Sequence, residues 1–253
     1  MKSANRGPNE ARRNPGVAVP SGPQPWNDPR IAQGMRRQSE LRARRLDAGA
    51  RLIGWKVGFG APAAKERLKI ESPLVGFLLD QAVLSSGATV SLRGWQKPVA
   101  EPEIAIHLGR DVAPDAPAAA ARAAIAALAP AIEIADVDCP MDDVEAILAG
   151  DIFQRHVVLG SRDPSHRNPG GLSGRVRRSD TVLDVPADLQ ANTGDLVDIV
   201  RHVAATAALC ADGLRAGQVI IAGSVTPPLF VAPGENVTFE LVPIGAVSVA
   251  FAG

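Results

Sequence analysis

The stretch Pro98–Gly109 constrains the chain most, because it reads as an extended, largely apolar strand that carries two acids. Side chains alternate between the two faces of a strand with a period of two residues. Glu101 and Glu103 should therefore point the same way, while Ile104 and Ile106 point to the opposite face. The pattern predicts two carboxylates side by side on one face of an otherwise apolar strand.

Two interpretations of this acid pair are open. Carboxylates are seldom buried without a partner, and two that lie close together repel one another. A hard divalent cation would resolve both problems, because Mg²⁺, Mn²⁺ and Ca²⁺ prefer oxygen ligands. In the alternative, the strand lies at the edge of a sheet with its glutamates in water, which Pro102 allows because it lacks a backbone N–H.

A second apolar strand with a central acid favours the cation. Residues 129–136 read Ala-Pro-Ala-Ile-Glu-Ile-Ala-Asp and place Glu133 in the middle of the strand. An alanine-rich helix is expected before it, from about residue 116 to 128. Two strands joined by a helix could then supply three carboxylates to one ion.

Five short segments now suggest a family. In chain order they are Gly-Trp-Lys-Val-Gly at 54–58, Gly-Phe-Leu-Leu-Asp at 76–80, Glu-Pro-Glu-Ile-Ala at 101–105, Pro-Ala-Ile-Glu-Ile at 130–134 and Ile-Ala-Gly-Ser-Val-Thr-Pro-Pro at 221–228. Together they resemble the fumarylacetoacetate hydrolase superfamily, in particular its 2-keto-4-pentenoate hydratase and 4-oxalocrotonate decarboxylase branch. The resemblance extends from near residue 30 to the C-terminus.

The expected fold is α+β. Short strands punctuated by Pro and Gly after residue 76 predict a mixed β-roll or barrel-like sheet, similar to the C-terminal domain of fumarylacetoacetase. The predicted organisation is a disordered tail at 1–25, an N-terminal helical cap segment at 26–75 and a β-rich catalytic domain at 76–253. The tail contains five prolines and almost no large apolar side chains, so it cannot offset its ordering entropy.

A dinucleotide-binding fold is a weaker alternative. Gly58 and Gly60 lie between a predicted strand at 52–57 and a predicted helix at 62–68, as in a dinucleotide fingerprint. The short strands that follow do not form repeated βαβ units, which argues against that fold. A basic helix is expected after Asp28, either as a solvated face or as a cap whose arginines steer an anionic substrate.

The resemblance also implies a site. It implies that Glu101, Glu103 and Glu133 hold Mg²⁺ or Mn²⁺ and that Lys56 lines the pocket as the proton carrier. From the sequence alone, Lys56 could equally extend to the surface. Asp80 corresponds less securely to an active-site acid, because relatives often carry two adjacent acids where this chain has Asp80-Gln81.

The strand predicted at 219–222 ends in a polar segment. Its Gly223, Ser224 and Thr226 could bind a substrate carboxylate through hydroxyl and backbone N–H groups, although an ordinary turn would look the same. Relatives often carry an acid-asparagine-small-residue stretch before the strand at 157–160, whereas this chain has Asp-Ile-Phe-Gln-Arg-His at 151–156. This departure leaves the identity of the substrate open.

The implied activity is metal-dependent chemistry on 2-oxo acids with conjugated double bonds, in the catabolism of aromatic compounds. Water addition by a hydratase is preferred, and decarboxylation is the second choice. Relatives that cleave acylpyruvates commonly use a histidine on an N-terminal lid, but the four histidines here are at 107, 156, 166 and 202. A metal-binding relative without turnover is the non-enzyme alternative.

Composition limits the partners and the compartment. The 27 basic and 27 acidic residues balance, so no bulk attraction to nucleic acid is expected. No apolar run reaches the roughly 18 residues that a membrane span needs. Cys139 and Cys210 lack metal or redox spacing, which suits a reducing cytoplasm. We expect a cytoplasmic homo-oligomer that binds a small 2-oxo acid.

Overall fold

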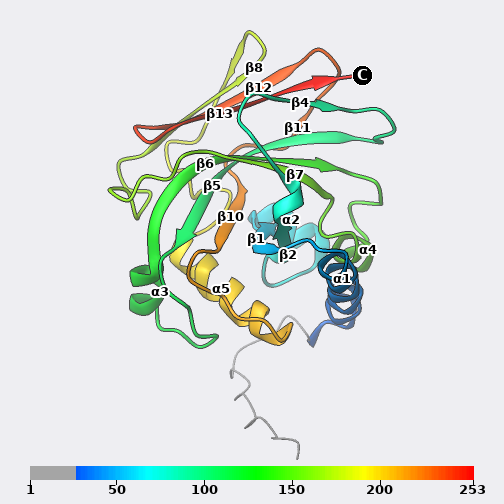
Figure 1. Ribbon diagram of the computed structural model, residues 1–253, viewed down its shortest axis with the longest axis vertical. Helices are drawn as coiled ribbons and strands as arrows, with labels where there is room; N and C mark the ends of the chain where they lie inside the picture. The colour runs from blue at the N-terminus through cyan, green and yellow to red at the C-terminus, as the bar shows by residue number, and fades with distance from the viewer. Residues whose placement is uncertain (1–26) are drawn as a thin grey trace, which may run out of the picture.

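The strands form two sheets in two layers (Figure 1). The computed structural model describes residues 27–253, so the predicted tail at 1–25 lies outside the described residues. The larger sheet has the order β2-β1-β10-β5-β6-β7-β3, and β11 also pairs with β5. Its strands are β1 (Leu52–Gly58), β2 (Leu74–Leu79), β3 (Val83–Leu84), β5 (Pro98–Leu108), β6 (Ile125–Asp136), β7 (Gln154–Leu159), β10 (Val219–Ser224) and β11 (Leu229–Phe230).

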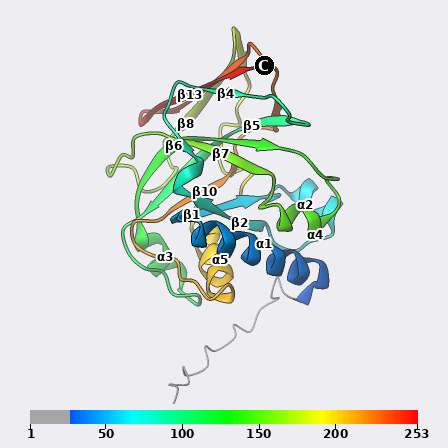
Figure 2. The same ribbon diagram turned by 45° about the vertical axis from the view of Figure 1, so that its right-hand side comes forward.

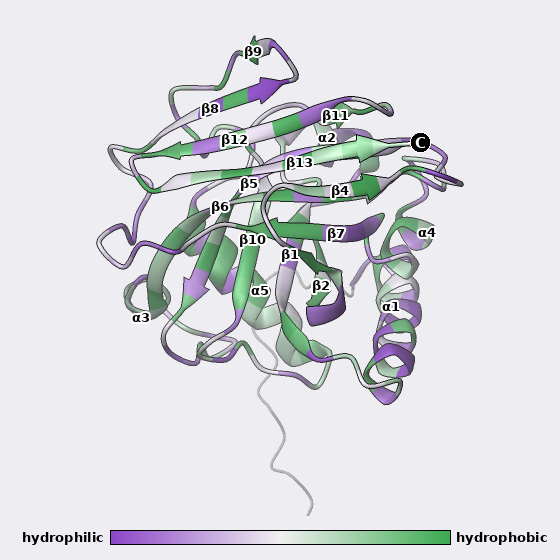
Figure 3. Ribbon diagram, turned by 45° about the horizontal axis from the view of Figure 1, so that its top comes forward, coloured by the Kyte–Doolittle hydropathy of each residue, from purple (hydrophilic) through white to green (hydrophobic). Residues whose placement is uncertain are grey.

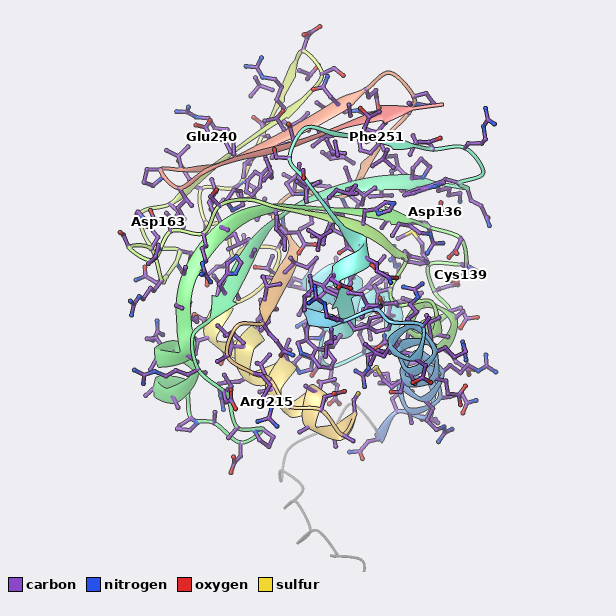
Figure 4. All side chains as sticks on the ribbon, in the orientation of Figure 1. Asp136, Cys139, Asp163, Arg215, Glu240 and Phe251 are labelled. Atoms are coloured by element: carbon purple, nitrogen blue, oxygen red, sulfur yellow. The ribbon has the colours of Figure 1, made fainter. Side chains whose placement is uncertain are left out.

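The smaller sheet has the order β4-β13-β12-β8-β9. Its strands are β4 (Ala88–Ser91), β8 (Ser173–Arg178), β9 (Thr181–Leu183), β12 (Asn236–Val242) and β13 (Gly245–Ala252). The β12–β13 hairpin turns at residues 243–244, as its alternating sequence predicts. Buried Val237, Phe239 and Val249 face the larger sheet, and Figure 4 shows Phe251 and Glu240 in the same layer.

Five α-helices flank the sheets in the described part of the chain. They are α1 (Pro29–Asp47), α2 (Pro62–Leu68), α3 (Ala118–Ala124), α4 (Val144–Ala149) and α5 (Leu196–Leu209), and a short 3₁₀ helix, η2, covers Asp80–Ala82. Asp28 caps α1 and Asp195 caps α5, each by accepting hydrogen bonds from backbone N–H groups of the first turn. Figure 2 shows α1 and α5 below the larger sheet. None of the described helices has the length and apolarity that a bilayer crossing requires.

Two of the predicted helices are too long. The alanine-rich segment leaves the helix at Ala124, and β6 begins at Ile125. Apolar residues along one side of the segment 195–214 also predict a helix to residue 214, but α5 ends at Leu209. In the first case pairing with β5 along nearly the whole of β6 outweighs the helix propensity of alanine.

The α+β fold prediction is confirmed. Parallel pairs join β1 to β10, β3 to β7 and β4 to β13, while the other paired strands are antiparallel. No repeated βαβ sheet exists among residues 27–253, so the dinucleotide-binding alternative is wrong. The predicted boundary at residue 75 falls inside β2, whose partner β1 also pairs with β10. The division into cap and catalytic domain therefore stays a proposal.

One face of the larger sheet carries most of the apolar core. Side chains such as Ile104, Ile132 and Ile220 pack there with the smaller sheet and with α5. Figure 3 shows hydrophobic stretches, in green, along strands of both sheets. A smaller buried cluster combines three alanines, Ala105, Ala129 and Ala131, with larger residues such as Leu78 and Val157. The sheet curls strongly toward its opposite face, as the contact between Lys56 and Glu133 shows.

Lys56 on β1 contacts Glu133 on β6, although β10 and β5 lie between them. Adjacent strands are about 4.8 Å apart, so three strand spacings separate these residues along the sheet. Their side chains can meet only if the sheet curls toward this face. The acids therefore lie inside an incomplete barrel, as the barrel-like prediction requires.

The edge-strand interpretation of Pro98–Gly109 is wrong. β5 is a central strand, paired with β10 on one side and with β6 on the other. Pro102 is tolerated because the β10 register shifts between Ile221 and Ser224, so the ladder does not need its missing N–H. Its carbonyl accepts a hydrogen bond from Val225 N at 2.8 Å.

The basic helix α1 is not simply a solvated face. Arg42 is buried, lies 5.4 Å from the centre of the Trp55 ring and pairs with Asp212. Arg45 lies 5.9 Å from the centre of the Phe77 ring. These two arginines attach α1 to the larger sheet through cation–π contacts.

Candidate active site

Three glutamates converge inside the curl of the larger sheet. Glu101 on β5 lies directly opposite Glu133 on β6, and Glu103 is the next residue on the same face of β5. One carboxylate oxygen from each lies within 4.8 Å of the others. Glu103 and Glu133 are each 1% exposed, and Glu101 is partly buried. Strand register thus places three carboxylates around one point.

A bulge in β10 fixes the second of these acids. Gly223 N donates a hydrogen bond to Glu103 Oε2 at 2.8 Å. The register shift between Ile221 and Ser224 frees this N–H from the ladder. Gly223 has φ +97°, a left-handed conformation that glycine adopts without strain.

Lys56 is buried among these acids. Its side chain leaves β1 on the concave face, and its ammonium group pairs with Glu133. Nζ also donates a hydrogen bond to the Ile152 carbonyl at 2.9 Å. Only 1% of Lys56 is exposed, so the alternative of a lysine that extends to the surface is wrong.

A fourth buried carboxyl belongs to Asp151, which follows α4. Its Oδ1 accepts a hydrogen bond from Phe77 N at 2.9 Å. Its Oδ2 is buried and has no hydrogen-bond partner among the described residues. The residue is completely buried, so this oxygen has no access to bulk water.

Burial and mutual repulsion raise the pKa values of these acids. Burial, together with the negative charge of Glu133, raises the pKa of Glu101 to about 7. Burial is also the largest cause of the rise in the pKa of Asp151, to about 8. The pKa of Glu103 lies well above its ordinary value for the same reasons as that of Glu101. Burial also raises the pKa of Glu133, although Lys56 opposes the rise.

Lys56 shows the complementary effect. Burial alone would lower its pKa, but the charges of Glu133 and Glu101 outweigh burial and hold the pKa above its ordinary value. In the absence of an added cation this lysine therefore carries its proton. A single positive charge faces four carboxyl groups, and their raised pKa values show that it does not neutralise them.

This donor set fits a hard divalent cation. Three carboxylates offer only oxygen ligands, which Mg²⁺ and Mn²⁺ prefer to nitrogen or sulfur. Two further positive charges would offset the repulsion that now raises the pKa values of the three glutamates.

The structure separates Asp80 from this cluster. Asp80 is the first residue of η2 and accepts hydrogen bonds from Arg51 N at 2.9 Å and from Arg51 Nε at 2.8 Å. These contacts lower the pKa of Asp80, which is the opposite of the shift at the buried acids. A catalytic role for Asp80 stays a prediction, and its described contacts do not connect it to Lys56.

Gly223 and Ser224 lie beside Glu103, and the Gly223 N–H and the hydroxyls of Ser224 and Thr226 already have partners in the chain. The Gly223 N–H binds Glu103, as described above. Ser224 Oγ donates to Pro102 O at 3.4 Å, and Thr226 Oγ1 donates to Pro227 O at 3.1 Å. Their role in binding substrate stays a prediction.

Sequence reasoning missed Asp151 and the carbonyl of Ile152 as parts of the site. A signal for Asp151 was present, because it occupies the acid position of the family's acid-asparagine-small-residue pattern before β7. The asparagine of that pattern is replaced by Ile152, which contributes its backbone oxygen to Lys56. No local pattern could reveal that contact, since it joins residues 96 positions apart.

Comparison with known proteins supports the resemblance. Residues 55–251 match the family profile described as fumarylacetoacetate (FAA) hydrolase C-terminal. The chain belongs to this family. The match covers most of the chain and includes Lys56, the three glutamates and Asp151.

Curated relatives in the family carry two kinds of name. A 4-oxalocrotonate decarboxylase of Pseudomonas sp is 28% identical over 223 residues, which cover 85% of each chain. A 2-keto-4-pentenoate hydratase of Paraburkholderia xenovorans is 28% identical over 221 residues, covering 85% of this chain and 81% of the relative. Among solved structures, the chain is similar to 4-oxalocrotonate decarboxylase from Pseudomonas putida G7, complexed with magnesium and adipate, with a TM-score of 0.80 and 24% identity. The match covers 87% of this chain and 85% of the decarboxylase chain.

Proposed function

We propose that this protein is a divalent-metal-dependent hydratase that acts on 2-hydroxy-2,4-dienoates or 2-oxo-4-enoates in the catabolism of aromatic compounds. The observation that carries the proposal is the buried cluster of three glutamates with Lys56 at hydrogen-bonding distance. The hydratase relative named above supports the substrate class. Mg²⁺ or Mn²⁺ is the expected cofactor.

The roles of the residues follow from their positions. Glu101, Glu103 and Glu133 would hold the ion, which would act as a Lewis acid toward the oxygens of a 2-oxo acid. Gly223 keeps Glu103 oriented through its backbone N–H. Lys56 carries a proton at Nζ and exchanges it with the conjugated chain of the substrate. The concave face excludes bulk water, because Lys56 and two of the glutamates are almost fully buried.

Decarboxylation is the second candidate function. The specific observation in its favour is the 28% identity to a 4-oxalocrotonate decarboxylase over 85% of both chains. A decarboxylase substrate of that kind carries a second carboxylate, whereas a pentenoate carries one. The same ion site and proton carrier would serve both reactions, so the distal part of the substrate distinguishes them.

One experiment separates these candidates. The purified protein is incubated with a panel of 2-hydroxydienoates, 2-oxohexenedioates and acylpyruvates, with Mg²⁺, with Mn²⁺ or with EDTA. Loss of dienol ultraviolet absorbance with water added to the product is the expected result, and carbon dioxide release identifies a decarboxylase. Metal binding without turnover of any compound would contradict both activities. Homo-oligomeric assembly and cytoplasmic location stay predictions, which light scattering and cell fractionation test.

A further inference from the structure

The turn between α4 and β7 has an unusual backbone. Asp151, Ile152 and Phe153 are consecutive non-glycine residues with φ values of +59°, +52° and +65°. L-residues rarely enter this left-handed region, and a β-branched residue such as Ile152 is especially disfavoured there. A strained run of this kind persists only where surrounding contacts impose it, and such runs gather at functional sites.

Helix termination alone does not explain the turn. A helix end usually places glycine in the left-handed position, because glycine has no Cβ to clash. Here Gly150 has φ −88°, and the left-handed position passes to Asp151, a carboxylate. Placing an acid at the C-terminal end of a helix also opposes the helix dipole.

The contacts of the turn converge on Lys56. The carbonyl of Ile152 accepts a hydrogen bond from Lys56 Nζ at 2.9 Å. Asp151 Oδ1 accepts one from Phe77 N, on the strand that pairs with the strand of Lys56. The turn therefore binds both the head group of the lysine and the strand beside it.

Gly76 provides the space for this arrangement. It lies directly opposite Lys56 in the β1–β2 pair. A methyl group at Gly76 would lie 2.6 Å from Asp151 Oδ1 and 2.8 Å from Lys56 Cγ. Both distances are shorter than the 3.0 Å below which Cβ atoms essentially never approach other heavy atoms. The carboxylate of Asp151 and the stem of Lys56 thus share the volume that a side chain would otherwise fill.

We propose that Asp151 is a positioning residue for Lys56. Its carboxylate, fixed by Phe77 N and lying over Gly76, holds the lysine stem on one side, while the turn that it begins presents the Ile152 carbonyl to Nζ. Lys56 is thereby kept against Glu133 and aimed into the space in front of the glutamates. The inference rests on the proposed function, in which Lys56 carries the proton.

The test compares Asp151→Asn with Asp136→Asn. Asparagine keeps the shape and can still accept from Phe77 N, but its amide replaces the buried Oδ2 and can never ionise beside the lysine. Asp136 is a matched control, because it is also buried and accepts backbone hydrogen bonds, from Gln96 N at 2.9 Å and Lys97 N at 2.8 Å. It lies at the end of β6 (Figure 4).

For Asp151→Asn we expect kcat to fall by roughly tenfold to a hundredfold, the size of a small misplacement of a reacting group. KM and the calorimetric affinity for Mg²⁺ should stay close to those of the parent, because the ion ligands are untouched. Asp136→Asn should retain the parent kcat. An unchanged kcat in Asp151→Asn would overturn the inference. So would a parallel loss of Mg²⁺ affinity, which would assign Asp151 to the ion site instead.

Two further measurements keep the inference testable. A crystal structure of metal-free Asp151→Asn should show Lys56 Nζ displaced from the Ile152 carbonyl; an unmoved Nζ would contradict the positioning role even if no substrate is turned over. If Asp151→Asn does not fold, Gly76→Ala, which pushes the two side chains apart, must show the same selective loss of kcat. Failure of the parent to turn over any compound would count against the proposed function alone, since the crystal structure still decides the role of Asp151.

Discussion

Lys56 supplies one positive charge to a space that also contains Glu101, Glu103, Glu133 and Asp151. Taking a charge out of water is costly unless a partner compensates it. The lysine compensates Glu133 directly, and the raised pKa values of Glu101 and Asp151, about 7 and about 8, show that the remaining acids lack such a partner. At the level of residues, the excess of carboxyl groups over positive charges therefore favours the binding of a cation.

The first prediction concerns the three proposed ion ligands. Changing Glu101, Glu103 or Glu133 singly to Gln keeps the side-chain shape and removes one negative charge. Affinity for Mg²⁺ and Mn²⁺ should fall by at least tenfold in each variant, because a neutral amide oxygen is a weaker ligand for a hard cation. Isothermal titration calorimetry measures the affinity. Unchanged titrations in all three variants would refute the ion site, and Asp136→Asn again serves as the control.

The second prediction separates Lys56 from the ligands. Lys56→Met keeps the length and the apolar stem but deletes the titrating nitrogen. A positioned proton-transfer group typically contributes 10²–10⁴-fold, so kcat should fall by roughly that factor. Metal affinity should not weaken, because an ammonium group is no ligand for a hard cation. Turnover near the parent rate would move the proton-transfer role elsewhere, with Asp80 as the next candidate.

At the scale of elements, the site depends on the close fit of β1 against β10. Gly54 lies opposite Val219, and a Cβ at Gly54 would lie 1.8 Å from the Val219 carbonyl oxygen. The Val219 oxygen is a backbone atom, and the Cα of Gly54 that would carry the methyl is held by the paired strands, so neither can move aside. Lys56 is two residues further along β1, which means that any displacement of this strand also displaces the proton carrier.

The third prediction follows from that fit. Gly54→Ala should lower the free energy of unfolding by about 3 kcal/mol or more, the upper range for overpacked sites. Gly150→Ala is the matched control: its φ is −88°, and an added methyl would meet nothing closer than 3.5 Å. The control should change stability by about 1 kcal/mol or less. Equal urea midpoints for the two variants would contradict the predicted clash.

How far the sequence predicts these elements depends on whether the signal is local. The acid pair on β5, the α2 helix and the β12–β13 hairpin have local patterns, and each was predicted close to its observed bounds. The segment 116–128 was misread because its composition favours a helix while its partner β5 lies elsewhere in the chain. The left-handed turn at Asp151–Phe153 contains no glycine or asparagine, so its local sequence does not predict it.

At the scale of the whole molecule, curvature brings the site together. Lys56, Glu101, Glu133 and Asp151 come from β1, β5, β6 and the end of α4, and only a curled sheet lets β1 reach β6. Periodicity in the sequence could place each acid on a face, but not the strand order or the curl. The short strands after residue 76 and the family resemblance together predict a barrel-like sheet and a shared metal site, but the strand order comes from the structure.

The last prediction links this buried charge to the stability of the whole protein. In the metal-free folded state Asp151, with a pKa of about 8, and Glu101, with a pKa of about 7, retain protons at pH 6.5 that the unfolded chain has already released. The folded state binds more protons than the unfolded state, so the free energy of unfolding must fall as the pH rises.

Between pH 6.5 and 8 this effect is opposed by three histidines. The lowered pKa values of His107, His156 and His202 add an opposite trend that fades toward pH 8, because the unfolded chain still binds part of their protons near pH 6.5. Each proton retained only by the folded state contributes a slope of up to about 1.4 kcal/mol per pH unit. After the opposite contribution of the histidines, urea unfolding in EDTA should show a net loss on the order of 1 kcal/mol between pH 6.5 and 8.

Saturating Mg²⁺ should reverse the trend, because the ion binds the deprotonated carboxylates and stabilises the folded state more as the pH rises. Asp151→Asn should flatten the EDTA profile, since asparagine has no proton to retain, whereas Asp136→Asn should leave the profile unchanged. A metal-free protein that becomes more stable between pH 6.5 and 8 would show that the four carboxyl groups are ionised without a cation. The charge argument for the ion site would then fail, whatever the protein proved to catalyse.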